Sequence, residues 1–280
     1  CIINQYNHYK NNFAHLLRMK IKYFTLAILV ILIVVCGVAA WILYGSKTSN
    51  PENYSCVGEI STPWGYERIN KDDGFAQYLR ELPLKERGSK VEYYTGGEAR
   101  FQSINYAVVD LPMLSNDEQC ADVCMRLRAE YLYKNGKPIS FKDVNGNTLR
   151  FSSGSRKSFE KYLRKVYGVA STFSLKRDME HRDLKDIQPG DVFVYAAGDH
   201  DLERKVNSKY GHAIMVVDVA ENKDGKRAFL LAEGNTPARN VHLLRNLQNP
   251  WNSPWFTLDE DAESFILSIF YYKKNELRKF

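Results

Sequence analysis

Metal-binding patterns are absent from this chain of 280 residues. Its five cysteines and six histidines show no CxxC and no HExxH spacing, so we expect no metal site and no cofactor. No repeat period and no long low-complexity tract is present, which argues against solenoids and disordered chains. Hydrophobic residues make up 44% and aromatic residues 13%, as in ordinary folded proteins. The part beyond the N-terminal segment therefore has the size of about one domain with a proper core.

Acidic residues are missing ahead of Glu52, whereas Lys10, Arg18, Lys20 and Lys22 all precede a long apolar run. Subtracting these four from the 39 lysines and arginines leaves 35 basic against 33 acidic residues, so the pI of 8.9 mainly reports the N-terminal flank. A nucleic-acid partner usually needs a basic face on the folded part. We therefore expect no nucleic-acid partner.

Charged residues are also missing from residues 24–44, which read FTLAILVILIVVCGVAAWILY. At about 1.5 Å per residue, a helix of this length spans a hydrocarbon core of about 30 Å. Because a basic flank stays on the cytoplasmic side, the rest of the chain is expected on the extracytoplasmic, periplasmic side. The sequence therefore predicts a cell-envelope protein in four parts: a basic cytoplasmic flank 1–23, a transmembrane segment 24–44, a tether 45–58 and an extracytoplasmic globular domain 59–280.

Two points about the N-terminal part stay open. Met19, followed by Lys20 and Lys22, has the pattern of a start with a short basic region, and residues 1–18 would then be an upstream extension. Val38-Ala39-Ala40 offers a weak cleavage site for a signal peptide. The apolar run is longer than the about 7–15 residues usual in signal peptides, so an uncleaved membrane anchor is favoured.

The domain pattern places helices first and an antiparallel sheet afterwards, which predicts the α+β class. Ser115 with Glu118 forms a capping-box pattern ahead of the helix EQCADVCMRLRAEYLY. A hairpin is expected over 139–151, with its turn at Asn145-Gly146. After Pro189-Gly190 follow three expected strands, DVFVY, GHAIMVVDV and RAFLLAE. The remaining expected elements are a helix after Asp73, a strand over 104–109 and a helix over 158–167.

Cys120 is the best-placed thiol of the domain. Outside the apolar run only Cys56, Cys120 and Cys124 remain, and three cysteines leave an odd one after any disulfide. Cys120 is expected in the first or second turn of its helix, where the partial positive charge of the N-terminus favours thiolate. The alternative is structural, because Cys120, Cys124, Leu127 and Tyr131 follow the i, i+4, i+7, i+11 spacing of a core-facing stripe.

His212 follows Gly211 at the start of an expected strand, which suggests a polar residue at the mouth of a cleft. If residues 222–225 form the next turn, paired residues on the two strands sum to 447. Glu233 then lies opposite Ile214, and Asn235 lies opposite His212, both on the face of the imidazole. Cys120, His212 and Glu233 together make the Cys–His–polar arrangement of thiol hydrolases.

The strand motifs resemble a known family. Gln188 to Tyr195 (QPGDVFVY), followed by Gly211 to Val217 (GHAIMVV), is similar to the second half of NlpC-type cell-wall peptidases. The resemblance covers about residues 115–235 and implies a papain-like fold, with N-terminal helices packed on an antiparallel sheet. It also implies Cys120 as nucleophile, His212 as base and Glu233 as the third polar residue.

A closer similarity covers most of the exported part. The stretches TPWGYERI, LRELPLK, QCADVCMRLRAEYLY, PGDVFV, GHAIMVVDVA, FLLAEGNTPA and SPWF look like an uncharacterised bacterial domain-of-unknown-function family (4846). This family has no established activity. It more often has Gln at the position of Glu233, and this chain carries a polar insert from about Asp199 to Lys209, which would be a lid or a loop.

The sequence thus predicts an envelope thiol hydrolase that cleaves peptide or amide bonds, with a cell-wall peptide or another envelope compound as its substrate and with the membrane contacted through residues 24–44. The alternative is a non-catalytic envelope binding module on the same fold, with Trp64, Trp251 and Trp255 available for sugar or peptide binding. A third interpretation is a structural protein held by a Cys56–Cys120 or Cys56–Cys124 disulfide.

Overall fold

The computed structural model describes residues 19–37, 48–69, 74–199 and 210–280. The chain divides into two compact units, residues 1–46 and 47–280. In the first unit, Met19–Gly37 form a helix whose residues are exposed. Its 19 residues are long and apolar enough to cross a membrane, and it is consistent with a signal sequence or an anchor. The remainder of the expected apolar segment, 38–44, lies outside the described residues.

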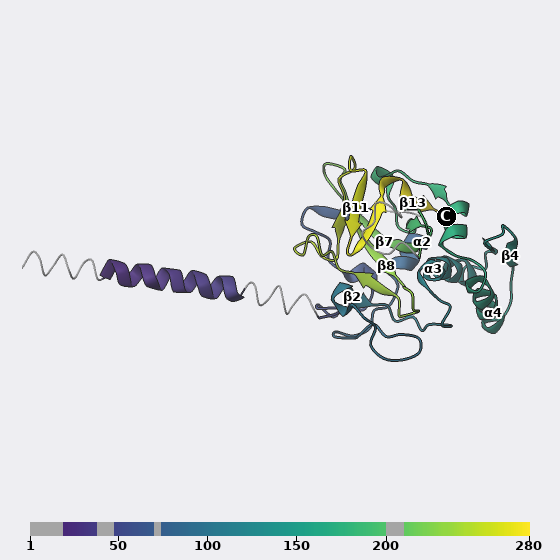
Figure 1. The fold of residues 1–280 in the computed structure, drawn as a ribbon, viewed down its shortest axis with the longest axis horizontal. Coiled ribbons are helices and arrows are strands. Elements are labelled where there is room, and N and C mark those ends of the chain that lie inside the picture. The colour runs from purple at the N-terminus through teal and green to yellow at the C-terminus, as the bar shows by residue number, and fades with distance from the viewer. Residues whose placement is uncertain (1–18, 38–47, 70–73, 200–209) are drawn as a thin grey trace, which may run out of the picture. The chain divides into compact units, whose positions relative to one another are not determined.

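A nine-stranded antiparallel sheet organises the second unit (Figure 1). Its main path runs through seven strands in the order β2 (Asn105–Val108), β9 (His242–Leu244), β8 (Arg227–Glu233), β7 (His212–Asn222), β6 (Val192–Tyr195), β13 (Leu277–Lys279) and β5 (Glu180–His181). Two short strands pair beside this path, β1 (Tyr66–Arg68) with β7 and β10 (Phe256–Thr257) with β8.

Helices and two separate hairpins complete the unit. The helices are α2 (Gly74–Arg80), α3 (Cys120–Lys134), α4 (Arg156–Tyr167) and α5 (Thr172–Asp178). The hairpins pair β3 (Ile139–Lys142) with β4 (Thr148–Phe151), and β11 (Ser264–Leu267) with β12 (Phe270–Lys273). Short 3-10 turns occupy Val57–Glu59, Gln102–Ile104, Leu184–Asp186 and Lys274–Glu276. The expected α+β class with a large antiparallel sheet is confirmed.

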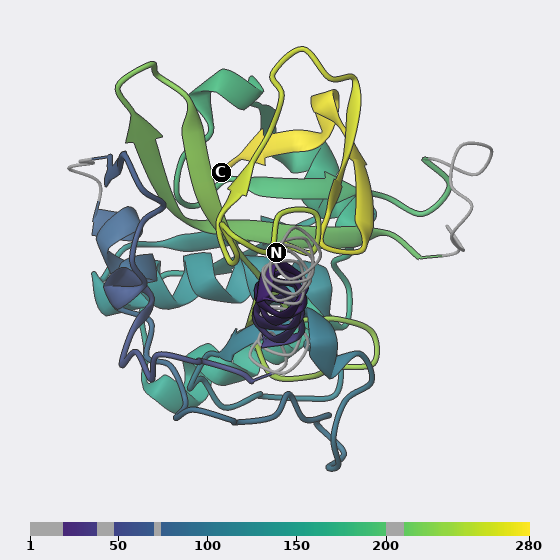
Figure 2. The same ribbon diagram turned by 90° about the vertical axis from the view of Figure 1, so that its left-hand side faces the viewer.

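The two faces of the sheet bury different layers because side chains alternate along β7. Ala213, Met215 and Val217 share a core with α3, whereas Ile214 and Val216 share one with the β11–β12 hairpin. Figure 2 shows α3 on one side of the central strands and the yellow hairpin on the other. The α3 helix and the hairpin therefore pack on alternate residues of β7, from opposite faces of the sheet.

The register of β7 and β8 near their site-facing ends is the one expected from the sequence. Met215 pairs with Ala232 and Val216 pairs with Leu231, so these pairs sum to 447. Beyond a bulge between Val216 and Asp218, the pairs sum to 448. The turn is one residue tighter than expected, because the Asn222 N–H donates to the Lys226 carbonyl at 3.0 Å. The bulge cancels this difference, since it adds one unpaired residue to β7.

The first turn of α3 differs from the expected one. The capping box joins Gln119 to Asp122, whose carboxylate accepts from the Gln119 N–H at 3.0 Å, and the expected Ser115–Glu118 box does not form. Glu118 is buried instead and bonds the Arg126 guanidinium and the Leu114 N–H. A buried arginine requires a carboxylate partner, and this outweighs the local capping preference.

Part of the segment expected as a tether belongs to the folded unit. Residues 48–58 pack against the domain, with Val57 fully buried. The buried Asn50 side chain donates to the carbonyls of Tyr54 and Lys85 at 2.8 and 3.0 Å. The polar composition that suggested a tether is thus used to satisfy buried backbone groups. Residues 45–47 lie outside the described residues.

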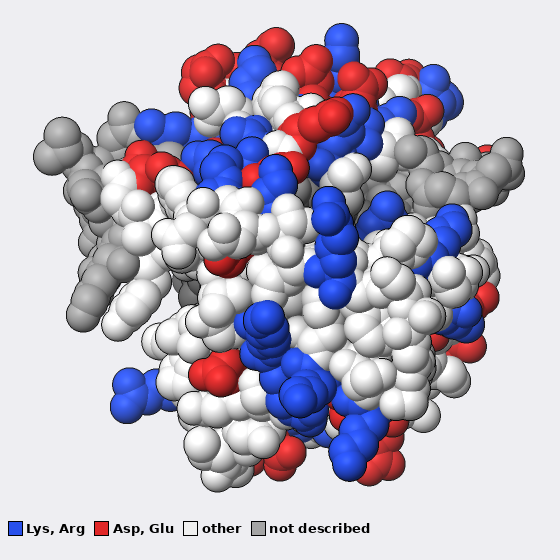
Figure 3. All heavy atoms as spheres, turned by 90° about the vertical axis from the view of Figure 1, so that its right-hand side faces the viewer, with Lys and Arg blue, Asp and Glu red and all other residues white. Residues whose placement is uncertain are grey.

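The charged side chains of this unit are mixed in sign. Figure 3 shows lysines and arginines together with aspartates and glutamates on one face. Several of them form ion pairs, such as Glu160 of α4 with Arg156 and Arg164 at 2.9 and 3.6 Å. Exposed pairs of this kind contribute little to stability.

Candidate active site

Cys120 is the first residue of α3, and its N-cap is Gln119. This places the thiol in the first helical turn, where the partial positive charge of the helix terminus is strongest. The side chain is 6% exposed, and its Sγ lies 4.0 Å from the carbonyl oxygen of Gly211, directly before β7. The thiol therefore lies at the end of the sheet.

Two glycines allow α3 and its neighbours to approach the strand ends this closely. A Cβ on Gly234, directly after β8, would lie 2.5 Å from a methyl carbon of Val123 in α3. A Cβ on Gly211, directly before β7, would lie 2.1 Å from the Thr172 hydroxyl and 2.6 Å from the Tyr195 carbonyl. Side chains at either position would push these elements apart, and Cys120 would move away from the strand ends.

His212 and Glu233 meet across adjacent strands, as expected. The Nε2–H of His212 donates to Oε2 of Glu233 at 2.6 Å, and both residues are buried. Because Nε2 is used by Glu233, Nδ1 is the ring nitrogen left for Cys120, whose charge and proximity raise the pKa of His212. Asn235, the other candidate partner of the ring, bonds Glu233 instead, with Nδ2 3.4 Å from Oε1.

The charges of this buried group support one another. Burial alone would lower the pKa of His212, but the Glu233 carboxylate and the interaction with Cys120 raise it to about 9. Burial alone would raise the pKa of Glu233, but the charge and hydrogen bonds of His212 and His242 lower it to about 2. At neutral pH these pKa values favour an imidazolium on His212 beside a carboxylate on Glu233.

The family described as Domain of unknown function (4846), DUF4846, matches residues 57–156 and 152–279. The chain belongs to the DUF4846 family. Curated proteins gave no match, and solved structures gave none either. The DUF4846 family has no known function.

The other cysteines of the DUF4846 domain have different surroundings. Cys56, Cys120 and Cys124 are all free thiols, so neither of the two disulfides considered from the sequence is present. Cys124 is fully buried, and burial raises the pKa of its thiol well above the usual range. It packs in the core with Leu127 and Tyr131, as the stripe predicted. Cys120 leaves that stripe and turns toward Gly211.

The sequence argument missed three residues of the site, because each comes from an element that it did not predict or assign. His242 begins β9 and places Nε2 3.3 Å from Oε1 of Glu233. Phe270 of β12 stacks on the His212 ring, with centroids 4.1 Å apart and an interplanar angle of 23°. The neighbouring Tyr272 is fully buried, and its hydroxyl has no hydrogen-bond partner among the described residues. The only available signal was that His242 lies nine residues after Glu233.

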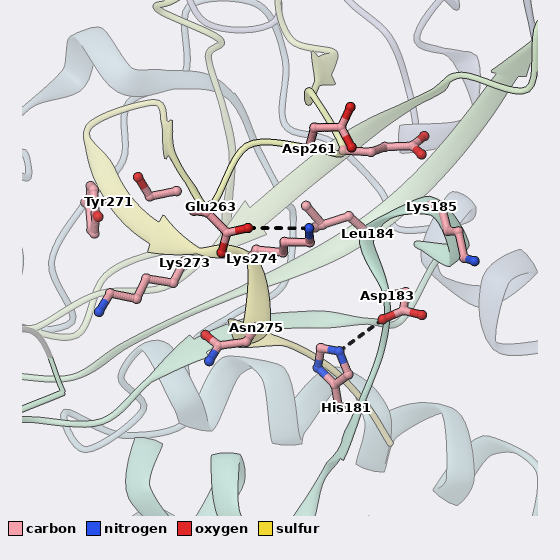
Figure 4. A pocket seen from close by; sticks show the side chains of 12 residues that line it. His181, Asp183, Leu184, Lys185, Asp261, Glu263, Tyr271, Lys273, Lys274 and Asn275 are labelled. Atoms are coloured by element: carbon pink, nitrogen blue, oxygen red, sulfur yellow. Dashed lines mark hydrogen bonds and ion pairs between the residues drawn. The ribbon is translucent and has the colours of Figure 1, made fainter.

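A surface cavity of about 710 Å³ lies away from this group and is lined by neither Cys120 nor His212. Figure 4 shows two ionisable pairs in its lining, with His181 directed toward Asp183 and Lys274 toward Glu263. These contacts measure 3.2 and 3.7 Å. The cavity holds no cysteine, whereas the Cys120 group combines a thiol, an imidazole and a carboxylate, so this group is the candidate active site.

No group of three or more His, Cys, Asp and Glu side chains in the described parts of the DUF4846 chain is arranged to hold a metal ion. The Glu233 carboxylate accepts hydrogen bonds from His212 and Asn235. The polar insert expected as a lid or loop lies, from 200 to 209, outside the described residues.

Proposed function

We propose that this DUF4846 domain is a thiol hydrolase that cleaves peptide or amide bonds, with cell-wall peptides as the substrate class. The observation that carries the proposal is the Cys120–His212–Glu233 group, in which Cys120 begins α3 and the His212 imidazole hydrogen-bonds the Glu233 carboxylate at 2.6 Å. The similarity of the β6 and β7 motifs to NlpC-type peptidases, which have a papain-like fold, supports the substrate class. The apolar N-terminal helix supports a location in the cell envelope, with the domain on the extracytoplasmic side.

In the first half of the reaction, the Cys120 thiolate attacks the carbonyl carbon, and a C–S bond forms. The Cys120 N–H belongs to the first helical turn, whose amides have no partner within the helix, so it supplies one donor to the developing oxyanion. As the C–N bond breaks, the His212 imidazolium gives its Nδ1 proton to the leaving amine. A thioester on Cys120 and neutral His212 remain.

In the second half, neutral His212 takes a proton from water, and the resulting hydroxide attacks the thioester carbonyl. The C–S bond breaks, the acid product leaves, and the imidazolium–thiolate pair is restored. Glu233 orients the ring through Nε2 and stabilises its positive charge in both halves.

The test compares Cys120→Ser with the matched control Cys56→Ser, using the full chain in detergent micelles and purified peptidoglycan as substrate. Wild type and the Cys56 variant should release new amine ends. Cys120→Ser should release none above background, although it folds, because serine lacks the thiolate and differs little in size. Hydrolysis that survives Cys120→Ser would contradict the proposal. So would the absence of hydrolysis by wild type on wall peptides of all the common cross-link types.

A binding module is the second candidate, and exposed tryptophans favour it. Trp64 is 99% exposed and Trp251 is 72% exposed, whereas Trp255 is buried and donates from Nε1 to the Ser61 carbonyl at 2.7 Å. Exposed indole rings stack on sugars and peptides. The test is sedimentation with insoluble peptidoglycan. If the domain is a binding module, the Cys120→Ser variant should still sediment with peptidoglycan, whereas a Trp64→Ala, Trp251→Ala double variant should not.

A further inference from the structure

His242 lies at the first position of β9, directly opposite Glu233 of β8 in the strand register. It is buried, and both of its ring nitrogens face oxygen atoms. Nε2 lies 3.3 Å from Oε1 of Glu233, and Nδ1 lies 3.0 Å from the carbonyl oxygen of Asn240. The ring thus bridges a side-chain carboxylate and the backbone.

These two contacts determine the protonation of His242. A carbonyl oxygen and an ionised carboxylate are acceptors only, and a neutral imidazole has a single N–H. A neutral His242 would direct a lone pair at one of the two oxygens. Both contacts become hydrogen bonds only when both nitrogens carry protons, and His242 is then an imidazolium.

Glu233 is accordingly held between two imidazoles. Oε2 accepts from His212 at 2.6 Å, and Oε1 accepts from Nδ2 of Asn235 at 3.4 Å and lies 3.3 Å from Nε2 of His242, so both carboxylate oxygens are used. The second positive charge compensates a carboxylate that is completely buried and would otherwise favour protonation. A protonated Glu233 could no longer stabilise the His212 imidazolium.

We propose that His242 is a positioning residue that keeps Glu233 ionised and directed at His212, so that the thiol works at the end of a chain of alternating charges. In this chain the thiolate is followed by an imidazolium, a carboxylate and a second imidazolium, and its net charge is zero. The inference rests on the proposed function, because it assigns His242 a role in activating the same Cys120.

Other ionisable groups lie near this chain of alternating charges, and they are the same in the wild type and in the variants compared below. Tyr195 of β6 has its ring centroid 6.4 Å from that of His212, and Tyr272 of β12 interacts electrostatically with Glu233. Cys124 and Asp122 belong to α3, the helix that begins with Cys120. Burial raises the pKa of Tyr272 and of Cys124 well above the usual range, so neither ionises near neutral pH.

The test uses His242→Gln, whose amide can still donate to Glu233 but carries no charge. The rate of Cys120 alkylation by iodoacetamide is measured against pH in the full chain, with the modified peptide identified by mass spectrometry. Without the second imidazolium, the buried group has a net charge of −1 whenever the thiolate forms. We expect the pH midpoint of alkylation to rise by about one unit, which is about a tenfold lower rate below the midpoint.

The matched control is His181→Gln, because His181 also contacts a carboxylate, at 3.2 Å from Asp183, but is 50% exposed and lies on β5 at the far edge of the sheet. It should leave the midpoint unchanged. A folded His242→Gln with the wild-type midpoint would overturn the role of His242. A wild-type midpoint at or above about 8.5, the value of an ordinary thiol, would instead contradict the proposed function itself, and the role of His242 with it.

A second measurement needs no variant and covers the case in which His242→Gln does not fold. In ¹⁵N-histidine spectra of the wild type at pH 7, both ring nitrogens of His242 should carry protons. A ring with one protonated and one bare nitrogen would refute the inference.

Discussion

Replacing Glu233 by Gln isolates the electrostatic part of its role. The amide is nearly the same size and keeps one oxygen that accepts from His212, so the ring can stay in place. It removes the negative charge, and its NH₂ group would face the Nε2–H of His242, where the carboxylate now accepts at 3.3 Å. The variant therefore tests whether the charge of Glu233, rather than its shape, keeps His212 protonated.

The size of the effect follows from the pKa of His212. Burial lowers this pKa, and Glu233 is the largest of the influences that raise it from 6.5 to about 9. That rise corresponds to about 3 kcal/mol of stabilisation of the imidazolium, which is present in full below pH about 6.5 and is lost as the pH rises through about 9. In Glu233→Gln the pKa should return to 6.5 or below. At pH 7 the protonated fraction of His212 then falls from about 99% to about a quarter or less.

Activity should fall by about 10- to 100-fold at pH 7, which is a smaller loss than that caused by Cys120→Ser, since the amide still orients the ring. The assay is a pH titration of the His212 ring by ¹⁵N NMR, with the signal assigned by comparison with His212→Gln. Glu263→Gln is the control, because that carboxylate is 88% exposed and pairs with Lys274 away from the site. A His212 ring that still titrates near pH 9 in Glu233→Gln would refute the reasoning.

Two further predictions concern the first turn of α3. Gly234→Ala should destabilise the fold by about 1–3 kcal/mol and slow Cys120 alkylation, because the new Cβ would meet Val123 at 2.5 Å. In chemical denaturation, adding Val123→Ala should restore part of the lost free energy of unfolding. The control Gly168→Ala, whose Cβ meets nothing closer than 3.8 Å, should leave stability nearly unchanged. An unchanged stability in Gly234→Ala would contradict the tight approach of Gly234 to Val123. Burial raises the pKa of Asp122 to about 8, so the free energy of unfolding should decline as the pH rises from about 4 to about 8, because the unfolded carboxyl ionises first. Asp122→Asn should flatten this decline in urea unfolding at several pH values, and an unchanged slope would assign the decline to other groups.

The local parts of the fold could be predicted from the sequence. The β3–β4 hairpin turns at Asn145-Gly146, and Gly146 has a φ of +88°, the left-handed conformation for which glycine is suited. The continuous apolar runs of β6, β7 and β8 also predicted the correct strands, since both faces of the central sheet are buried. These signals lie within a few residues of one another.

The C-terminal part of the sheet could not be predicted in the same way. β13 inserts between β6 and β5, and β9 joins β8 to β2, so β13 pairs with strands more than 80 residues earlier and β9 pairs with β2 more than 130 residues earlier. Each of the two strands has only three residues, too few for a periodic pattern to be recognised. Their position depends on which sheet edges remain open, and this is a property of the complete fold.

The residues of the site also fall into two groups, those that local sequence signals predict and those that depend on the complete sheet. Glu233 could be placed beside His212 because both lie on one hairpin, where the register follows from the turn and a single face is shared. The actual turn is one residue shorter than expected, and a bulge restores the alignment, so the placement holds only on the site side of Asp218. His242 belongs to the pairing of β8 with β9, which fixes it opposite Glu233. His242 reaches the site through a short strand, and the complete sheet determines which strands pair with it. A residue in such a strand cannot be assigned to the site from the sequence, even when it affects the charge of the site.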